Sequence, residues 1–204
     1  MRLRLIAILT AVVVGVGLGF GVNWLWLDGG GHAAKIREGA SFGEVPIGGP
    51  FRLIDHNGTP RGPDDFKGQL LLVNFGYTFC PDVCPIGLQT MTAALDQLGG
   101  QAERVQPLFI TIDPERDTPE VLKSYVEHFT PRLIGLTGSA EDIAKAARAY
   151  RVYYKVAGDA KSDPNYLVDH SVLTYLMGPD GKFLTHFTHQ TPPDKMAATI
   201  RRYL

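Results

Sequence analysis

Two cysteines stand directly after a continuous apolar run, and this junction constrains the fold more than any other feature of the sequence. The run, Leu70 to Gly76, lacks the alternation of a half-exposed strand and is typical of a strand buried on both faces. Cys80 and Cys84 follow it, and the chain of 204 residues contains no other cysteine. A helical apolar pattern then begins at Pro85. Two thiols with no further partner form a disulfide, a redox pair or a soft-metal site.

Strands and helices alternate through most of the chain. We expect strands at 51–54, 69–75, 105–112, 133–136 and 152–156, a hairpin at 171–177 and 182–187, and helices from Pro85 and at 119–129, 140–150 and 194–203. Central strands without clean alternation predict a sheet that is covered on both faces. A cysteine pair just after a strand–helix junction of this kind is typical of the α/β thioredoxin-like fold.

The N-terminal segment differs in composition from the rest. No charged residue occurs from Leu5 to Leu27, which is long enough to cross a bilayer as a helix. Arg2 and Arg4 precede this stretch and place its start in the cytoplasm. A cleaved signal peptide is the alternative, although its apolar region would be unusually long. Both interpretations export the rest of the chain to a compartment where a disulfide can persist. The expected organisation is a transmembrane anchor at 1–27, a glycine-rich linker at 28–50 and a folded domain at 51–204.

Size and charge narrow the possible functions. The chain is long enough for the N-terminal segment and one domain of about 150 residues. A domain of that size can bury a core that is stable without disulfides or structural metals. The formal net charge is -1, and neither end carries a block of like charges. The charge therefore gives no reason to propose a nucleic-acid partner.

Each cysteine precedes a proline, which disfavours the helical conformation for both. We therefore expect Cys80 and Cys84 to bracket a tight loop just before a helix that starts at Pro85. Free N–H groups and the helix dipole at that point favour thiolates. A structural disulfide would close a very short loop and stabilise little. A redox dithiol usually has two intervening residues, and here there are three. Two thiolates are too few for structural zinc, whereas copper(I) accepts two or three soft ligands.

A copper site needs a search for a third ligand. His170 comes just before the expected strand at 172–177, and in thioredoxin-like sheets this entry loop often lies beside the cysteine loop. Neutral imidazole is a good ligand for copper. Asp169, or another acceptor, could hold the second ring nitrogen of His170. The remaining histidines are expected to be solvated or packed structurally: His32, His56, His128, His186 and His189.

Asp113 follows the second central strand, at the sheet edge that carries functional sites in open α/β folds. From there it could orient a ligand or a partner. The alternative is that Asp113 is only a turn and cap residue.

Three segments in order resemble the Sco/SenC/PrrC proteins, and the resemblance extends from about Gly49 to the C-terminus. They are Phe75–Pro85, Asp113–Pro119 and Val168–Ser171. The resemblance implies a thioredoxin-like fold, a membrane anchor and a domain outside the cytoplasm. Phe79 departs from the pattern, because many relatives carry a polar residue or histidine there. Phe79 adjoins the expected site without being a ligand, so the departure bears on exposure and partner contact.

Members of that family bind copper and serve assembly of the copper A centre of cytochrome c oxidase. The resemblance implies that Cys80, Cys84 and His170 are the copper ligands, with Asp113 in a supporting role. We thus expect a metallochaperone rather than an enzyme, which holds Cu(I) or Cu(II) and passes it to an oxidase subunit or to another copper chaperone. The expected location is the inner membrane, with the C-terminal domain in the periplasm.

The resemblance leaves open whether copper delivery or thiol reduction is the main role. In the alternative function, a thiol–disulfide oxidoreductase, Cys80 and Cys84 form a redox disulfide that acts on the cysteines of an exported partner. A binding module with a purely structural disulfide is a third hypothesis.

Overall fold

The computed structural model describes residues 46–158 and 163–204. The expected anchor at 1–27 and most of the expected linker lie outside these residues. Within the two described ranges, no helix combines the length and the apolar character needed to span a bilayer.

A mixed sheet of seven strands forms the centre of the domain, in the order β2-β1-β5-β4-β3-β8-β9. β3, β4 and β5 run parallel, and β8 pairs antiparallel with β3 on the other side. Every residue of β3 is buried, which accounts for its unbroken apolar sequence. The strands are β1 (Leu53–Asp55), β2 (Pro60–Arg61), β3 (Leu70–Gly76), β4 (Val105–Thr111), β5 (Ile134–Thr137), β8 (Leu173–Met177) and β9 (Phe183–Thr188).

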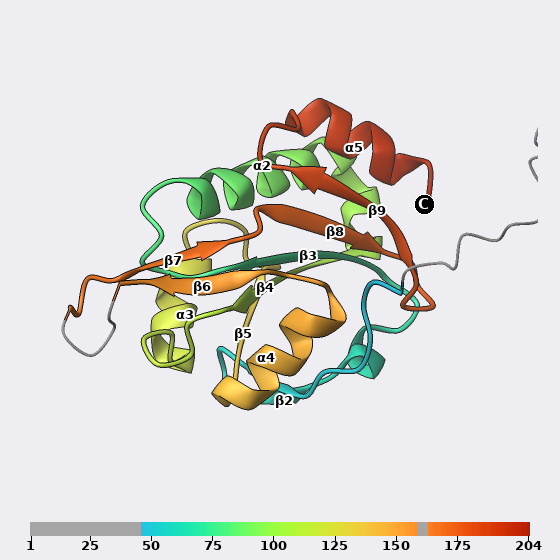
Figure 1. Cartoon of the computed structure of the whole chain (residues 1–204). Coiled ribbons are helices and arrows are strands. Elements are labelled where there is room, and N and C mark those ends of the chain that lie inside the picture. Colours follow the sequence, from blue (N-terminus) through green and yellow to red (C-terminus); the bar gives the residue numbers. More distant parts are fainter. Residues whose placement is uncertain (1–45, 159–162) are drawn as a thin grey trace, which may run out of the picture. The chain divides into compact units, whose positions relative to one another are not determined.

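Helices cover both faces of this sheet, as the sequence predicts. On one face, α2 and α5 pack against each other through a core cluster that includes Leu88 and Met196. On the other face, α4 contributes Ile143 to a second cluster that includes Phe75 (Figure 1). The helices are α2 (Val83–Leu98), α3 (Pro119–Val126), α4 (Ala140–Ala149) and α5 (Pro193–Arg201), with 3-10 helices η1 (Pro63–Phe66) and η2 (Gly99–Arg104). The predicted α/β class is confirmed.

A separate two-stranded ribbon was not predicted. β6 (Tyr154–Ala157) pairs antiparallel with β7 (Leu167–His170), and the ribbon is hydrogen bonded to itself rather than to the large sheet. His170 therefore ends a strand of its own, and the expectation that it opens the strand at 172–177 is wrong. Four residues of mixed polarity give too short a pattern to identify β7 from the sequence.

The start of α2 also differs from the expectation. The helix begins at Val83, so Cys84 lies in its first turn and Pro85 is its third residue. Proline is tolerated there because the first N–H groups of a helix have no partner within the helix. Cys80 remains in the loop before the helix, as expected.

Candidate metal centre

The two cysteines lie at the carboxyl edge of the large sheet, where β3 leads into α2. Cys80 donates its main-chain N–H to the carbonyl of Tyr77 at 3.2 Å, which closes the loop between strand and helix. Cys84 is drawn against β3, because a Cβ atom at Gly76 would lie only 2.7 Å from its Sγ. Both cysteines are free thiols, and their exposed fractions are 8% and 2%. The two thiols are thus nearly enclosed.

His170 reaches the cysteines from the end of β7. Its Nε2 lies 3.4 Å from Sγ of Cys84. Its Nδ1 lies 2.9 Å from the carbonyl oxygen of Ser171. Because a carbonyl oxygen only accepts, Nδ1 carries the proton of the neutral ring and Nε2 turns its lone pair toward the sulfurs. The sequence prediction that His170 lies beside the cysteines agrees with this placement.

Tyr77 joins the imidazole to the cysteine loop. Its ring packs edge-on against His170, with centroids 5.8 Å apart and planes at 84°. Its hydroxyl accepts a hydrogen bond from the main-chain N–H of Val168 in β7 at 3.2 Å. The ribbon that carries the histidine is therefore attached to the segment that carries Cys80.

The two thiols differ in acidity. A hydrogen bond from Cys84 holds the pKa of Cys80 well below its usual range; burial opposes this shift, while His170 and nearby main-chain N–H groups support it. The same hydrogen bond, together with burial, raises the pKa of Cys84. Cys80 therefore ionises first. A bound cation would be needed to hold both as thiolates, as is usual for metal-ligating cysteines.

The donor set fits a single soft ion. The three ligand atoms of Cys80, Cys84 and His170 all lie within 4.8 Å of one another. Three donors arranged around one ion at about 2.3 Å, the zinc–sulfur bond length, would lie roughly 4 Å apart. Little movement is thus needed for all three to bind together. Two thiolates and one imidazole suit copper better than the hard cations, which prefer oxygen ligands.

The two aspartates predicted to support the site occupy different environments. Asp169 is exposed on β7, and it points away from His170 because neighbouring strand residues face opposite sides. The carbonyl of Ser171 takes the place on Nδ1 that Asp169 could have filled. Asp113 is buried, accepts a hydrogen bond from the Tyr166 hydroxyl at 2.6 Å, and pairs with Arg116.

Arg116 extends the influence of Asp113 toward the cysteines. Its guanidinium carbon lies 3.6 Å from the ring centroid of Tyr166 and 4.9 Å from that of Phe79. It also donates to the carbonyl of Tyr166 at 3.0 Å. The Asp113–Arg116 pair thus connects the loop after β4 with the segment before β7 and with the residue next to Cys80.

Asp117 is a site-supporting residue that the sequence argument missed. It is fully buried and accepts hydrogen bonds from the N–H and hydroxyl of Thr78 and from the hydroxyl of Thr111. Burial raises its pKa, and the hydrogen bonds from Thr111 and Thr78 reduce this effect. The sequence offered one sign of this role: Asp117 lies four residues after Asp113, at the same edge of the sheet.

Comparisons with known proteins identify relatives of this arrangement. The SCO1/SenC family model matches residues 40–204. The human mitochondrial protein SCO1 homolog is 44% identical over 164 residues, covering 79% of this chain and 54% of the relative. The chain therefore spans little more than half the length of that relative.

Solved structures share the fold. Bradyrhizobium japonicum ScoI, solved with copper bound, is 44% identical with a TM-score of 0.72 and covers 78% of this chain and 99% of that chain. BsSco, described as a Sco family member of the cytochrome c oxidase assembly proteins with a disulfide switch, is 25% identical with a TM-score of 0.62, covering 78% and 94%. The predicted thioredoxin-like arrangement agrees with these matches.

Proposed function

Because the chain belongs to the SCO1/SenC family, we propose that it is a copper metallochaperone that serves assembly of the copper A centre of cytochrome c oxidase. The observation that carries this proposal is the convergence of two sulfurs and one imidazole nitrogen within 4.8 Å. Copper is the cargo of this protein, and Cys80, Cys84 and His170 are its ligands. An oxidase subunit, or another copper chaperone, receives the ion.

Transfer follows from the low number of ligands. Three donors leave room for a thiolate or imidazole of the acceptor to bind the ion before any donor leaves. The half-buried His170 gives access from one side, while both cysteines are enclosed. Asp113 supports this geometry through Arg116 and Tyr166 rather than by touching the ion.

Copper titration of the reduced protein tests this assignment. We expect His170→Ala and Cys80→Ser each to weaken Cu(I) binding by at least tenfold, and His170→Ala to alter the thiolate-to-copper charge-transfer band of the Cu(II) form. His128→Ala is a matched control, because this histidine is exposed and bonds Ser124 instead. If the His170 and Cys80 variants bound copper as tightly as the parent, the ligand assignment would be wrong.

Thiol–disulfide exchange is the second candidate, and the low pKa of Cys80 beside a second free thiol favours it. Exchange requires both cysteines and no imidazole ligand. Cells carrying His170→Ala would then retain oxidase assembly, and cells carrying Cys84→Ser would lose it. Loss of assembly in both strains would instead support copper delivery.

The proposed location is the inner membrane, with residues 1–27 as anchor and the folded domain in the periplasm. The charge-free stretch after Arg4 and the arginines before it support this orientation. Alkaline phosphatase fused to the C-terminus should be active, because this reporter works only outside the cytoplasm. An inactive but intact fusion would place the domain in the cytoplasm.

A further inference from the structure

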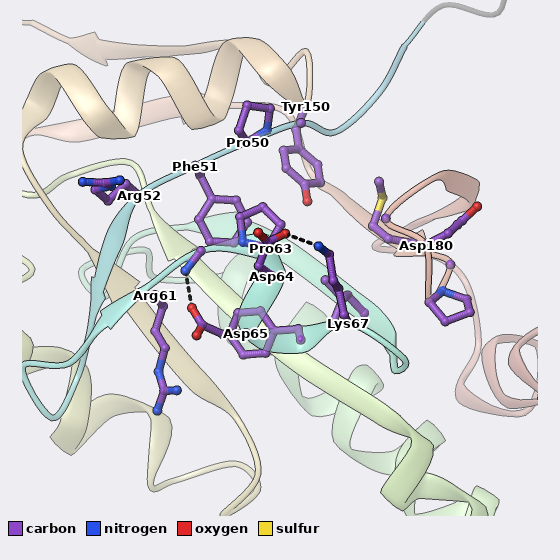
Figure 2. A pocket seen from close by; sticks show the side chains of 18 of the residues that line it. Pro50, Phe51, Arg52, Arg61, Pro63, Asp64, Asp65, Lys67, Tyr150 and Asp180 are labelled. Carbon is purple, nitrogen blue, oxygen red and sulfur yellow. Dashed lines mark hydrogen bonds and ion pairs between the residues drawn. The ribbon is translucent and has the colours of Figure 1, made fainter.

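A cleft of about 640 Å³ opens far from the cysteines, around the first residues of β3. Leu71 and its β8 neighbour Met177 are among the residues that line it. β3 extends about 16 Å from Leu71 to Gly76, and the cysteine loop begins only after Gly76, so the cleft and the cysteines lie at opposite ends of this strand. Segments 49–52, 60–67 and 177–181 form the walls, together with Tyr150 beyond the end of α4 (Figure 2). The volume is typical of clefts that bind small molecules.

Tyr150 supplies a hydrogen-bond donor that no neighbour uses. Its side chain is 2% exposed, and its ring is held by Phe75 at 5.3 Å and Tyr175 at 5.6 Å between centroids. The hydroxyl points into the cleft in Figure 2, and no hydrogen bond joins it to any residue in the described part of the chain. The hydroxyl is not one of the fully buried polar atoms that lack a partner in the described residues, so it is accessible from the cleft, where a ligand oxygen can accept its hydrogen bond. Burial raises the pKa of Tyr150, so the hydroxyl remains a donor.

The rest of the lining specifies the kind of partner. Proline and aromatic rings, among them Phe51 and Pro63, provide flat apolar walls. Three cationic and three carboxylate side chains line the cleft, which leaves it without net charge. Several of these charges are already engaged: Lys67 pairs with Asp64 at 2.9 Å, and Asp65 accepts the N–H of Gly62 at 2.6 Å. The lining therefore favours a ring-shaped, uncharged ligand.

We propose that this cleft binds an uncharged ring compound whose carbonyl or ether oxygen accepts a hydrogen bond from Tyr150. The function is separate from the proposed copper transfer, because none of Cys80, Cys84 and His170 lines the cleft.

Methionine-methyl NMR of the full chain in lipid nanodiscs provides the test. The methyl carbon of Met177 lies beside Gly48 at the cleft, whereas Met91 and Met196 belong to the core on the other face and serve as internal controls. The probes are 1-acetylnaphthalene, 1-ethylnaphthalene, which lacks the oxygen, and the anion 1-naphthoate. We expect 1-acetylnaphthalene to cause a saturable shift of Met177 alone, with an affinity about three- to tenfold above that of 1-ethylnaphthalene.

Variants separate the hydrogen bond from the rest of the cleft. Tyr150→Phe should abolish the preference for the ketone, and Tyr203→Phe, at an exposed tyrosine, should preserve it. Pro50→Trp should block the mouth and remove binding of both neutral probes. Copper affinity should be unchanged in all three variants, so the two proposals can fail separately. The proposal is overturned by absence of a saturable Met177 shift, by equal ketone and hydrocarbon affinities in the parent, or by tighter binding of 1-naphthoate.

Discussion

Asp117 accepts two hydrogen bonds from Thr78, one from the main-chain N–H at 3.0 Å and one from the hydroxyl at 2.5 Å. Thr78 is two residues before Cys80, and Asp117 is two residues before α3. This contact therefore fixes the cysteine loop to the segment that follows the neighbouring strand β4. Asp117 therefore helps to position the thiols indirectly, through its hydrogen bonds to Thr78, rather than through a hydrogen bond to either cysteine.

Removal of this carboxylate should loosen the cysteine loop. Asp117→Ala leaves three donors, two on Thr78 and one on Thr111, without their acceptor. We expect it to lower the free energy of unfolding by about 2–4 kcal/mol and to weaken Cu(I) binding. Urea unfolding and copper titration measure the two effects. Glu115→Ala, at an exposed residue of the same loop, is the control, and equal behaviour of the two variants would contradict the assigned role.

Gly76 should tolerate no side chain. A Cβ atom there would lie 2.7 Å from Sγ of Cys84 and 2.8 Å from Cε2 of Phe109. Gly76→Ala should therefore lower the free energy of unfolding by about 1–3 kcal/mol through overpacking, and it should displace Cys84 and weaken copper binding. Gly100→Ala is the matched control, since its Cβ would meet no atom within 4 Å. An alanine at position 76 that left both stability and copper affinity intact would argue against this packing.

Asp55 should make stability depend on acid pH. Burial alone would raise its pKa, but hydrogen bonds from Thr59 N–H, Arg61 and Asn57 N–H outweigh burial and hold it below the ordinary 3.8. The stabilisation of the fold by ionised Asp55 is therefore complete at pH values above 3.8, the ordinary pKa, and is lost as the pH falls through the lower pKa of the folded state.

The Asp55→Asn variant isolates this contribution. At pH 7 it should lower the free energy of unfolding by about 1.5–3 kcal/mol, the range for hydrogen bonds to charged groups, and the deficit should shrink toward pH 2. Urea unfolding at several pH values measures it. Asp64→Asn, at an exposed ion pair, should have little effect at any pH. A deficit that stayed constant with pH would count against the role of the charge.

Arg151 should be a site where glycine stabilises the fold. Its φ of 56° lies in the left-handed region just after α4, where Val152 N–H bonds the carbonyl of Ala147 at 2.8 Å. Arg151→Gly should raise the free energy of unfolding by about 1 kcal/mol, because glycine adopts this conformation without steric cost. Arg148→Gly, inside the helix, should lower it by about the same amount. Thermal unfolding of both variants checks the opposite signs.

The sequence predicts the strand and the helix on either side of the cysteines well, because each is specified by a pattern of neighbouring residues. The unbroken apolar run before Cys80 predicts a strand covered on both faces, and the pattern from Pro85 predicts a helix, which the structure starts two residues earlier, at Val83. The position of His170 rests on a contact across 86 residues. It was inferred from fold analogy and motif order rather than from any local pattern.

Other features depend on tertiary contacts that no short pattern records. The strand β7 is stabilised by pairing with β6 and by the Tyr77 hydroxyl. The residues of β7 alone therefore do not predict a strand. The same pairing determines that His170 faces the sulfurs and Asp169 faces solvent. Asp117 resembles an ordinary cap residue until Thr78 is brought against it. The cleft around Tyr150 is assembled from distant segments and leaves no motif.

The self-paired ribbon of β6 and β7 divides the proposed copper ligands between two structural parts of the domain. Both sulfurs belong to the edge of the large sheet, because Cys80 lies in the loop that follows β3 and Cys84 in the first turn of α2. The imidazole lies on the ribbon, whose two strands pair only with each other, and a hydrogen bond from Val168 N–H to the Tyr77 hydroxyl connects this ribbon to the cysteine loop. Moving the ribbon away would break this hydrogen bond and expose Tyr166 and Val168, which are buried in the core cluster that includes Phe75. If a partner displaced the ribbon, the proposed copper ion would be held by two sulfurs alone, with one side open to the ligands of an acceptor.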